Sequence, residues 1–219
     1  MFFACTDELE RLPKDQFVVE TTFTSDSNFQ LYAWRLYNQF PDVTTRNGRY
    51  NRLNEEFHSD LYNNSFNNTN GSDWLFGRIV VPGQSSGYSE PYRWIRSANL
   101  MLDNIDGENS LTETQEEHWR SVGYFFRSYS YYNLITKYGG VIWLENTLTD
   151  EDTDVLYGER DSRDLVAANM LEDLQYAADN IIPNGRTKDF YGTSINRNAV
   201  LALISRFGLF EGTWRKYHG

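Results

Sequence analysis

Carboxylates are the side chains of this chain most suited to acid and base catalysis. Glu55, Glu56 and Asp60 form their nearest cluster, within a stretch rich in Asn, Gly and Ser. Hydrolysis of a glycosidic bond needs two carboxyl groups about 5 to 10 Å apart. Sequence spacing does not fix that distance, so an all-helical glycoside hydrolase is kept as one alternative.

Residues 150–154, with the sequence DEDTD, alternate carboxylates as a calcium-binding loop does. A calcium loop of the EF-hand type requires glycine at its sixth position and glutamate at its twelfth. Here these positions hold Val155 and Asp161. We therefore interpret the segment as a solvated loop between two elements.

The three histidines, His58, His118 and His218, lie far apart in the sequence, and none has a second His or a Cys at metal-ligand spacing. No Gly-x-Ser-x-Gly motif occurs, so a nucleophilic hydrolase has no support either. The sequence thus predicts no catalytic residue, no metal site and no cofactor.

A binding site is better supported than a catalytic one. Asn67, Asn70, Asp73, Trp74 and Arg78 combine an aromatic face with hydrogen-bonding groups in the longest irregular stretch, residues 42–89. A sugar ring offers an apolar C–H face and a rim of hydroxyls, which this mixture would match. We predict these five residues as a ligand-binding site centred on Trp74, the alternative being that Trp74 anchors its loop to the core.

Apolar periodicity predicts an α-rich fold with little sheet. Pro91 suits the first turn of a helix that Gly107 ends, and Thr112 with Gln115 makes a capping-box pattern. From Val122 to Tyr138 apolar residues occupy every face, so that helix should be packed on all sides, and we interpret Trp94, Trp119, Trp143 and Trp214 as structural. The expected helices lie near 26–39, 90–105, 112–138, 162–181 and 194–210.

The charge balance limits the partners. With 31 acidic and 20 basic residues among 219, the chain carries a formal charge of −11, which repels nucleic acid and anionic membrane surfaces. No apolar run approaches the roughly 20 residues that cross a bilayer. Association with a membrane is therefore expected only through a lipid anchor.

The single cysteine, Cys5, excludes an intrachain disulfide. Residues 1–7, MFFACTD, resemble the end of a bacterial lipoprotein signal, in which the Cys becomes the lipidated first residue of the mature protein. The charged region and most of the apolar region of such a signal are missing before Phe2. The resemblance predicts Cys5 as the lipidated residue.

Four stretches, in this order along the chain, resemble the SusD/RagB family of outer-membrane nutrient-binding lipoproteins of Bacteroidetes. They are CTDELERLPKDQF at 5–17, YRWIRSANLMLDNI at 92–105, GYFFRSYSYYNLITKYGGVIWL at 123–144 and NGRTKDFYGTSINRNAVLALISRFGLFEGTWRKYHG at 184–219.

The resemblance implies an all-α fold of tetratricopeptide-like helix pairs with long irregular loops. It also implies a surface-exposed outer-membrane lipoprotein that captures a glycan, without catalysis, and passes it to a SusC-like TonB-dependent transporter. Members of the family are much longer, so we expect a lipoprotein signal remnant and extended segment at 1–25 and an incomplete N-terminal helical domain at 26–219. Peptide capture and a tetratricopeptide scaffold that contacts only protein are the remaining alternatives.

Overall fold

The computed structural model describes residues 22–41, 80, 83–107, 109–183 and 194–218. Within these ranges all regular structure is helical and no strand occurs, which confirms the all-α prediction. The helices are α2 (Asp26–Leu36), the 3₁₀ turn η1 (Tyr37–Gln39), α5 (Ser86–Asp103), α6 (Glu113–Tyr138), α7 (Thr153–Leu156), α8 (Arg163–Asn180) and α9 (Arg197–His218).

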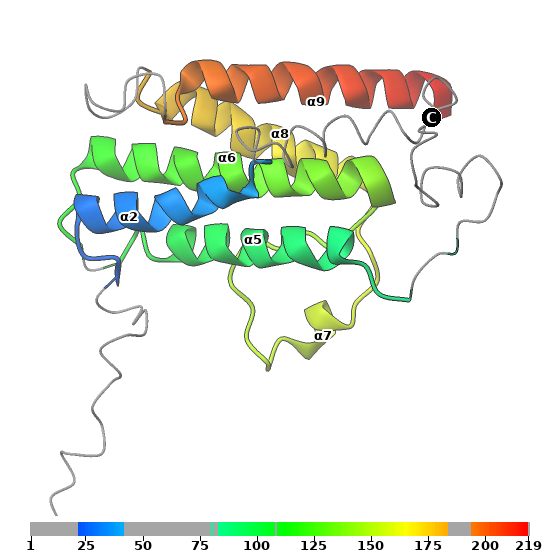
Figure 1. The fold of residues 1–219 in the computed structure, drawn as a ribbon, viewed down its shortest axis with the longest axis horizontal. Helices are drawn as coiled ribbons and strands as arrows, with labels where there is room; N and C mark the ends of the chain where they lie inside the picture. Colours follow the sequence, from blue (N-terminus) through cyan, green and yellow to red (C-terminus); the bar gives the residue numbers. More distant parts are fainter. Residues whose placement is uncertain (1–21, 42–79, 81–82, 108, 184–193, 219) are drawn as a thin grey trace, which may run out of the picture.

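Helix α6 is the centre of the fold. It contacts α2 and α5 on one side and α8 and α9 on the other, as Figure 1 shows. Consecutive long helices run antiparallel, α5 with α6 and α8 with α9, so the described part consists of two helix pairs stacked on each other (Figure 1). This is the tetratricopeptide-like arrangement that the sequence predicted.

The helices start where polar side chains satisfy their first N–H groups. The Ser25 and Ser162 hydroxyls accept hydrogen bonds from the N–H groups of Asn28, at 3.4 Å, and Leu165, at 3.2 Å. The N–H of Thr112 donates to Oε1 of Gln115 at 2.9 Å, as the predicted capping box requires. Short-range side-chain chemistry therefore fixes the starts of α2, α6 and α8.

Two helix boundaries differ from the prediction near α5. The helix begins at Ser86 and ends at Asp103, so Pro91 lies inside it and Gly107 lies beyond it. The carbonyl of Ser85 accepts the N–H groups of Tyr88 and Ser89, which closes the first turn ahead of the proline. Proline this close to the start removes one helical bond without ending the helix.

Helix α9 also differs from the prediction. It begins at Arg197 rather than near 194, and it continues to His218 rather than ending near 210. The residues beyond 210 contact the side of α8. The Arg163 guanidinium from α8 lies 4.0 Å from the centre of the Trp214 ring, and Arg215 forms an ion pair with Asp164 at 2.7 Å. These contacts with α8 stabilise the last turns of α9.

The aromatic helix α6 is packed on all sides, as its composition predicted. Phe126, Tyr131 and Leu134 are fully buried, and the small residues between them admit the neighbouring helices. The backbone of Gly123 lies so close to α5 that a Cβ there would come within 2.6 Å of a Leu102 methyl group. A side chain at this position would push α5 and α6 apart.

We expect Gly123→Ala to lower the free energy of unfolding by about 1 to 2 kcal/mol, because overpacking of Leu102 exceeds the gain in helix propensity. Gly208→Ala is the matched control, since that helical glycine in α9 has open space around it. The control should be neutral or stabilising by up to about 1 kcal/mol. Urea unfolding of both variants checks this, and equal effects would contradict the close contact.

His118, at the N-terminal part of α6, is buried, with 3% of its surface exposed. Its Nδ1 accepts the N–H of Ile182 at 3.4 Å, which requires that nitrogen to be unprotonated. Burial lowers the pKa of His118 to about 4. The folded protein therefore holds a neutral imidazole at pH values where an exposed one would be charged.

Because the folded pKa lies below the unfolded value of about 6.5, the stability from neutral His118 is present above pH 6.5 and lost as the pH falls toward 4. The loss should reach about 3 kcal/mol at most. We expect His118→Gln to flatten the fall in the thermal unfolding midpoint over this range. The exposed His218→Gln is the control, and a fall of the same size in all three proteins would refute the assignment.

Among the described residues, no helix is long and apolar enough to cross a bilayer.

Candidate ligand-binding groove

A cavity of about 670 Å³ lies between one face of α5 and the segment 142–156, which follows α6. This size lies within the usual range of small-ligand sites. Its lining combines aromatic, aliphatic, amide, hydroxyl and carboxylate groups. The lining residues are Tyr88, Tyr92, Arg96, Asn99, Ile142, Leu144, Asn146, Thr147, Leu148, Thr149, Asp150, Val155 and Leu156, and we call this cavity the tyrosine groove.

Helix α5 supplies one wall of the tyrosine groove. Tyr88, Tyr92, Arg96 and Asn99 recur at helical spacing and so share one face. The rings of Tyr88 and Tyr92 lie 5.3 Å apart, and the Tyr92 hydroxyl donates to the carbonyl of Ile142 at 2.9 Å. Burial raises the pKa of Tyr92, so this hydroxyl stays protonated and keeps its hydrogen bond.

The opposite wall, residues 142–149, is irregular, with bends at 145 and 146, and has no strand partner among the described residues. Its backbone groups bond to side chains instead: the Asn99 amide donates to the carbonyls of Leu144 and Asn146 at 2.9 and 3.1 Å. Arg96 donates to the carbonyl of Leu148 at 2.5 Å. The helix face that lines the groove thus also positions the wall across from it.

A glycine turn directs this wall away from α6. Gly139 has φ +72°, a conformation that favours glycine. A Cβ on Gly140 would come within 2.4 Å of the Asp161 carbonyl oxygen. The Asp161 carboxylate then accepts the N–H of Trp143 at 2.7 Å. The two glycines therefore set the position at which the wall begins.

Behind the wall lies a buried charge network centred on Arg127. Its guanidinium makes two hydrogen bonds of 2.7 Å to the Asp173 carboxylate and further bonds to Oδ1 of Asn99, at 3.2 Å, and the carbonyl of Glu145, at 2.8 Å. It also lies 5.2 Å from the centre of the Trp143 ring. Arg127 therefore joins α5, α6, α8 and the groove wall.

Both partners of the pair are nearly inaccessible, at 5% and 7% exposed. Burial alone would lower the pKa of Arg127, but its hydrogen bonds to Asp173 raise it above the usual value. Burial raises the pKa of Asp173, and the two bonds from Arg127 oppose that rise. We conclude that the guanidinium stays charged and that the pair is structural.

Removal of one partner leaves the other buried and unpaired. We expect Arg127→Met and Asp173→Asn each to lower the free energy of unfolding by about 3 to 5 kcal/mol. The control is Glu90→Gln, which breaks the exposed pair of Glu90 with Arg93 and should cost less than about 1 kcal/mol. Chemical denaturation measures all three, and a cost for Arg127→Met as small as that of the control would contradict the central role of the network.

A second cavity of about 680 Å³ borders the Arg127 network, and Asn146 lines both cavities. Its charged groups are largely engaged with one another: Asp106 pairs with Arg120 at 2.5 Å, and Asp103 accepts the N–H of Thr147 at 2.9 Å. The tyrosine groove has more apolar walls and fewer engaged charges, which makes it the better ligand site.

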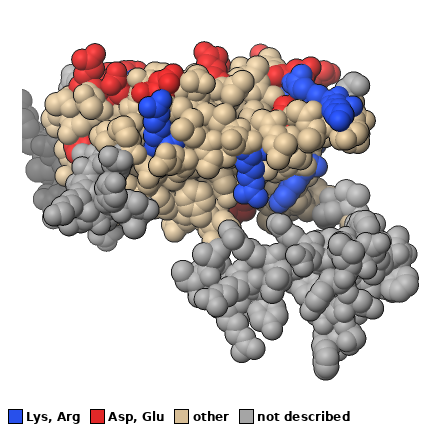
Figure 2. All heavy atoms as spheres, turned by 90° about the horizontal axis from the view of Figure 1, so that it is seen from above, with Lys and Arg blue, Asp and Glu red and all other residues tan. Residues whose placement is uncertain are grey.

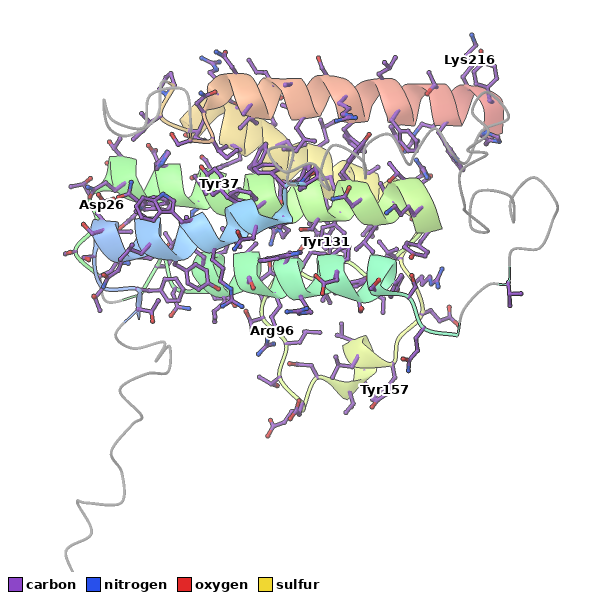
Figure 3. All side chains as sticks on the ribbon, in the orientation of Figure 1. Asp26, Tyr37, Arg96, Tyr131, Tyr157 and Lys216 are labelled. Atoms are coloured by element: carbon purple, nitrogen blue, oxygen red, sulfur yellow. The ribbon has the colours of Figure 1, made fainter. Side chains whose placement is uncertain are left out.

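Helix α7 forms the outer rim of the groove. The fraction of the side chain exposed rises along it from Val155, at 39%, through Leu156, at 46%, to the following Tyr157, at 87%. Figure 3 shows Arg96 projecting from α5 toward this segment, with Tyr157 at the end of α7. Our interpretation of residues 150–154 as a simple loop was incomplete, because Thr153 and Asp154 belong to this short helix.

The predicted site is not tested by the structure. Asn67, Asn70, Asp73, Trp74 and Arg78 lie outside the described residues, as do Cys5, His58 and the cluster around Glu55. Within the described ranges no group of three or more His, Cys, Asp or Glu side chains is arranged to hold a metal ion. Trp119 and Trp143 are structural as expected, since Trp119 is buried and Trp143 stacks on Tyr131 at 4.3 Å.

Sequence reasoning missed the groove residues of α5, although one signal was present. Tyr88, Tyr92 and Arg96 recur every four residues, so a polar aromatic face could be read from the sequence. Their partner wall, residues 142–149, has no periodicity that would reveal it. The groove exists only because the turn at Gly139 and Gly140 brings this wall back along α5.

A protein-family model matches most of the chain. Residues 20–209 match the family model described as SusD-like, starch-binding and associating with the outer membrane. The chain belongs to the SusD-like family. This confirms the resemblance drawn from the four sequence stretches.

Curated SusD-like relatives share low identity with the chain. The SusD-like protein P25 of Formosa agariphila is 24% identical over 202 residues, and a SusD-like protein of Bacteroides ovatus is 26% identical over 200. These alignments cover 80% and 83% of this chain but only 34% and 33% of the relatives. The chain therefore spans about a third of the length of the relatives it matches.

Solved structures confirm the SusD-like fold. A SusD-like protein from Bacteroides fragilis superposes with a TM-score of 0.70 at 21% identity, over 94% of this chain and 39% of that one. NanU of B. fragilis gives 0.68 at 16% identity, over 92% and 40%. A laminarin-binding SusD-like protein gives 0.55 at 18% identity, over 66% and 30%.

Proposed function

We propose that the chain is the N-terminal part of a non-catalytic glycan-binding lipoprotein of the outer-membrane surface, which captures an oligosaccharide and passes it to a SusC-like TonB-dependent transporter. The observation that carries the binding part is the tyrosine groove, in a chain whose family is described as starch-binding. Transfer to the transporter follows from the family resemblance.

The groove suits a sugar better than a wholly apolar ligand. Tyr88 and Tyr92 offer ring surface for the C–H face of a pyranose, while Asp150 offers a carboxylate for its hydroxyls. Burial of about 100 Å² of apolar surface contributes roughly 2 to 3 kcal/mol before ordering costs are subtracted. Such a contact supports capture with rapid release, which a delivery protein needs.

Catalysis and peptide capture are less well supported. Asp150 is the one carboxylate that lines the described groove, whereas glycoside hydrolysis requires two. A peptide bound as an added strand would need free backbone groups on the wall. Side chains of α5 already bond to the carbonyls of Leu144, Asn146 and Leu148.

The residues predicted from sequence complete the proposal. We propose that Cys5 carries the lipid anchor and that Trp74, with Asn67, Asn70, Asp73 and Arg78, adds a second aromatic contact to the bound glycan. This segment precedes Ser86, the first residue of α5, and Tyr88 of the groove lies in the first turn of that helix.

We expect Tyr88→Ala to weaken glycan binding about 5- to 30-fold, because it removes roughly 1 to 2 kcal/mol of ring contact. Trp74→Ala should weaken it in the same direction. The matched control is Tyr217→Ala, which removes a tyrosine that is 70% exposed on α9. Calorimetry against starch, laminarin, xylan and mannan, with circular dichroism to check folding, measures the effect.

Two results would refute the proposal. One is that the folded wild-type chain binds no polysaccharide, whether neutral or anionic. The other is that Tyr88→Ala and Tyr217→Ala bind with equal affinity. Release of reducing sugar during the assay would instead favour the glycoside hydrolase.

A further inference from the structure

A second groove, of about 280 Å³, lies between α2 and α5, and we call it the arginine groove. Arg35 from α2 and Arg93 and Arg96 from α5 line it, and none of its lining residues is a carboxylate. The half-buried Trp94 contributes aromatic surface beside its structural contacts with the core, whereas Tyr32 lines the groove from a buried position. Three positively charged side chains thus line one groove beside a tryptophan.

This concentration of charge contrasts with the rest of the molecule. The chain has a net charge of −11, and in Figure 2 Asp and Glu gather along one edge of the visible face while Lys and Arg are fewer. Salt screens exposed charges beyond about 8 Å at physiological ionic strength. A ligand inside the groove therefore experiences mainly its three arginines, although the whole molecule is acidic.

The guanidinium groups retain hydrogen-bonding capacity. Among the described residues Arg35 has no ion pair, and its side chain is exposed. Arg93 pairs only with Glu90, and 71% and 47% of these two side chains are exposed, so the pair is weak. Arg96 uses one of its five N–H groups on the carbonyl of Leu148. Each of the three can still donate to an anionic oxygen.

Arg96 also connects the two grooves, since it lines both. The tyrosine groove on one side of this residue and the arginine groove on the other are therefore neighbouring parts of one surface along α5. A ligand that occupies both must present an apolar ring face with hydroxyls at one end and an anionic group at the other. An oligosaccharide that carries acidic sugars has this chemistry.

We propose that the arginine groove selects an anionic glycan, with the carboxylate of a uronic acid or a sulfate ester on the bound sugar held by Arg35, Arg93 and Arg96. This inference rests on the proposed glycan-binding function and specifies its ligand. Nucleic acid is excluded by charge density, because duplex DNA presents one charge per about 1.7 Å and the net field of this chain repels it. A glycan with one charge per sugar or fewer meets far less repulsion.

The test pairs each anionic polysaccharide with its neutral counterpart. Polygalacturonate is compared with its methyl ester, and dextran that carries at most one sulfate per glucose with unmodified dextran, so that charge is the main difference within a pair. Poly-L-glutamate reports the binding of an acidic peptide. The variant is the double change Arg35→Gln and Arg93→Gln, which spares Arg96 and hence the wall contact at Leu148, and Arg197→Gln on α9 is the control.

We expect the 219-residue chain to bind at least one anionic polysaccharide ten-fold or more tightly than its neutral counterpart. The double variant should lose that preference, Arg197→Gln should keep it, and rising NaCl should reduce it. Binding of neutral polysaccharides alone overturns the inference and leaves the proposed function standing. The inference is also overturned if the double variant keeps the preference or if poly-L-glutamate binds equally well. If no polysaccharide binds at all, both the inference and the proposed function are overturned.

Discussion

The ion pair of Arg127 with Asp173 is the interaction on which the rest of this structure depends. A buried guanidinium is expensive to desolvate, so each of its hydrogen bonds must be supplied by a group at a fixed place. Asp173 comes from α8, Asn99 from α5 and the Glu145 carbonyl from the groove wall. The arginine is satisfied only while these groups keep their places, so the network constrains the packing of the elements that carry them.

Asn99 connects this network to the tyrosine groove. The same side chain accepts a bond from Arg127 through its oxygen and donates through its nitrogen to two carbonyls of the wall. The Asn99 amide thus connects core and groove, beside the direct bond from Arg127 to the Glu145 carbonyl, and its orientation follows from the need to satisfy both sides. The groove lies where it does partly because the buried Arg127 guanidinium needs these hydrogen bonds.

Much of the fold could be predicted from sequence because it is locally determined. The capping pattern at Thr112 and the apolar surface of 122–138 involve residues close in the chain, and both were predicted correctly.

The start of α5 was not predicted correctly. The sequence rule for proline considers the one hydrogen bond that proline removes, whereas many hydrogen bonds and contacts determine where the helix begins. The extension of α9 depends on contacts of Trp214 and Arg215 with α8. The tyrosine groove depends on contacts between residues about 50 positions apart, such as the hydrogen bond from Tyr92 to Ile142. Such long-range contacts have no periodic signal in one sequence.

The irregular wall at 142–149 takes its hydrogen bonds from helix side chains rather than from a sheet, and this affects the entropy of recognition. A loop that orders only on contact with a sugar loses about 1 to 2 kcal/mol per residue in backbone freedom at that moment. Here the hydrogen bonds of the wall form during folding, so a ligand bound at the proposed site would not have to order it and would lose less of its contact energy. The bonds that Asn99 and Arg96 make are to main-chain carbonyls, so they do not require particular side chains on the wall. A backbone held in this way lets specificity diverge while the architecture is kept.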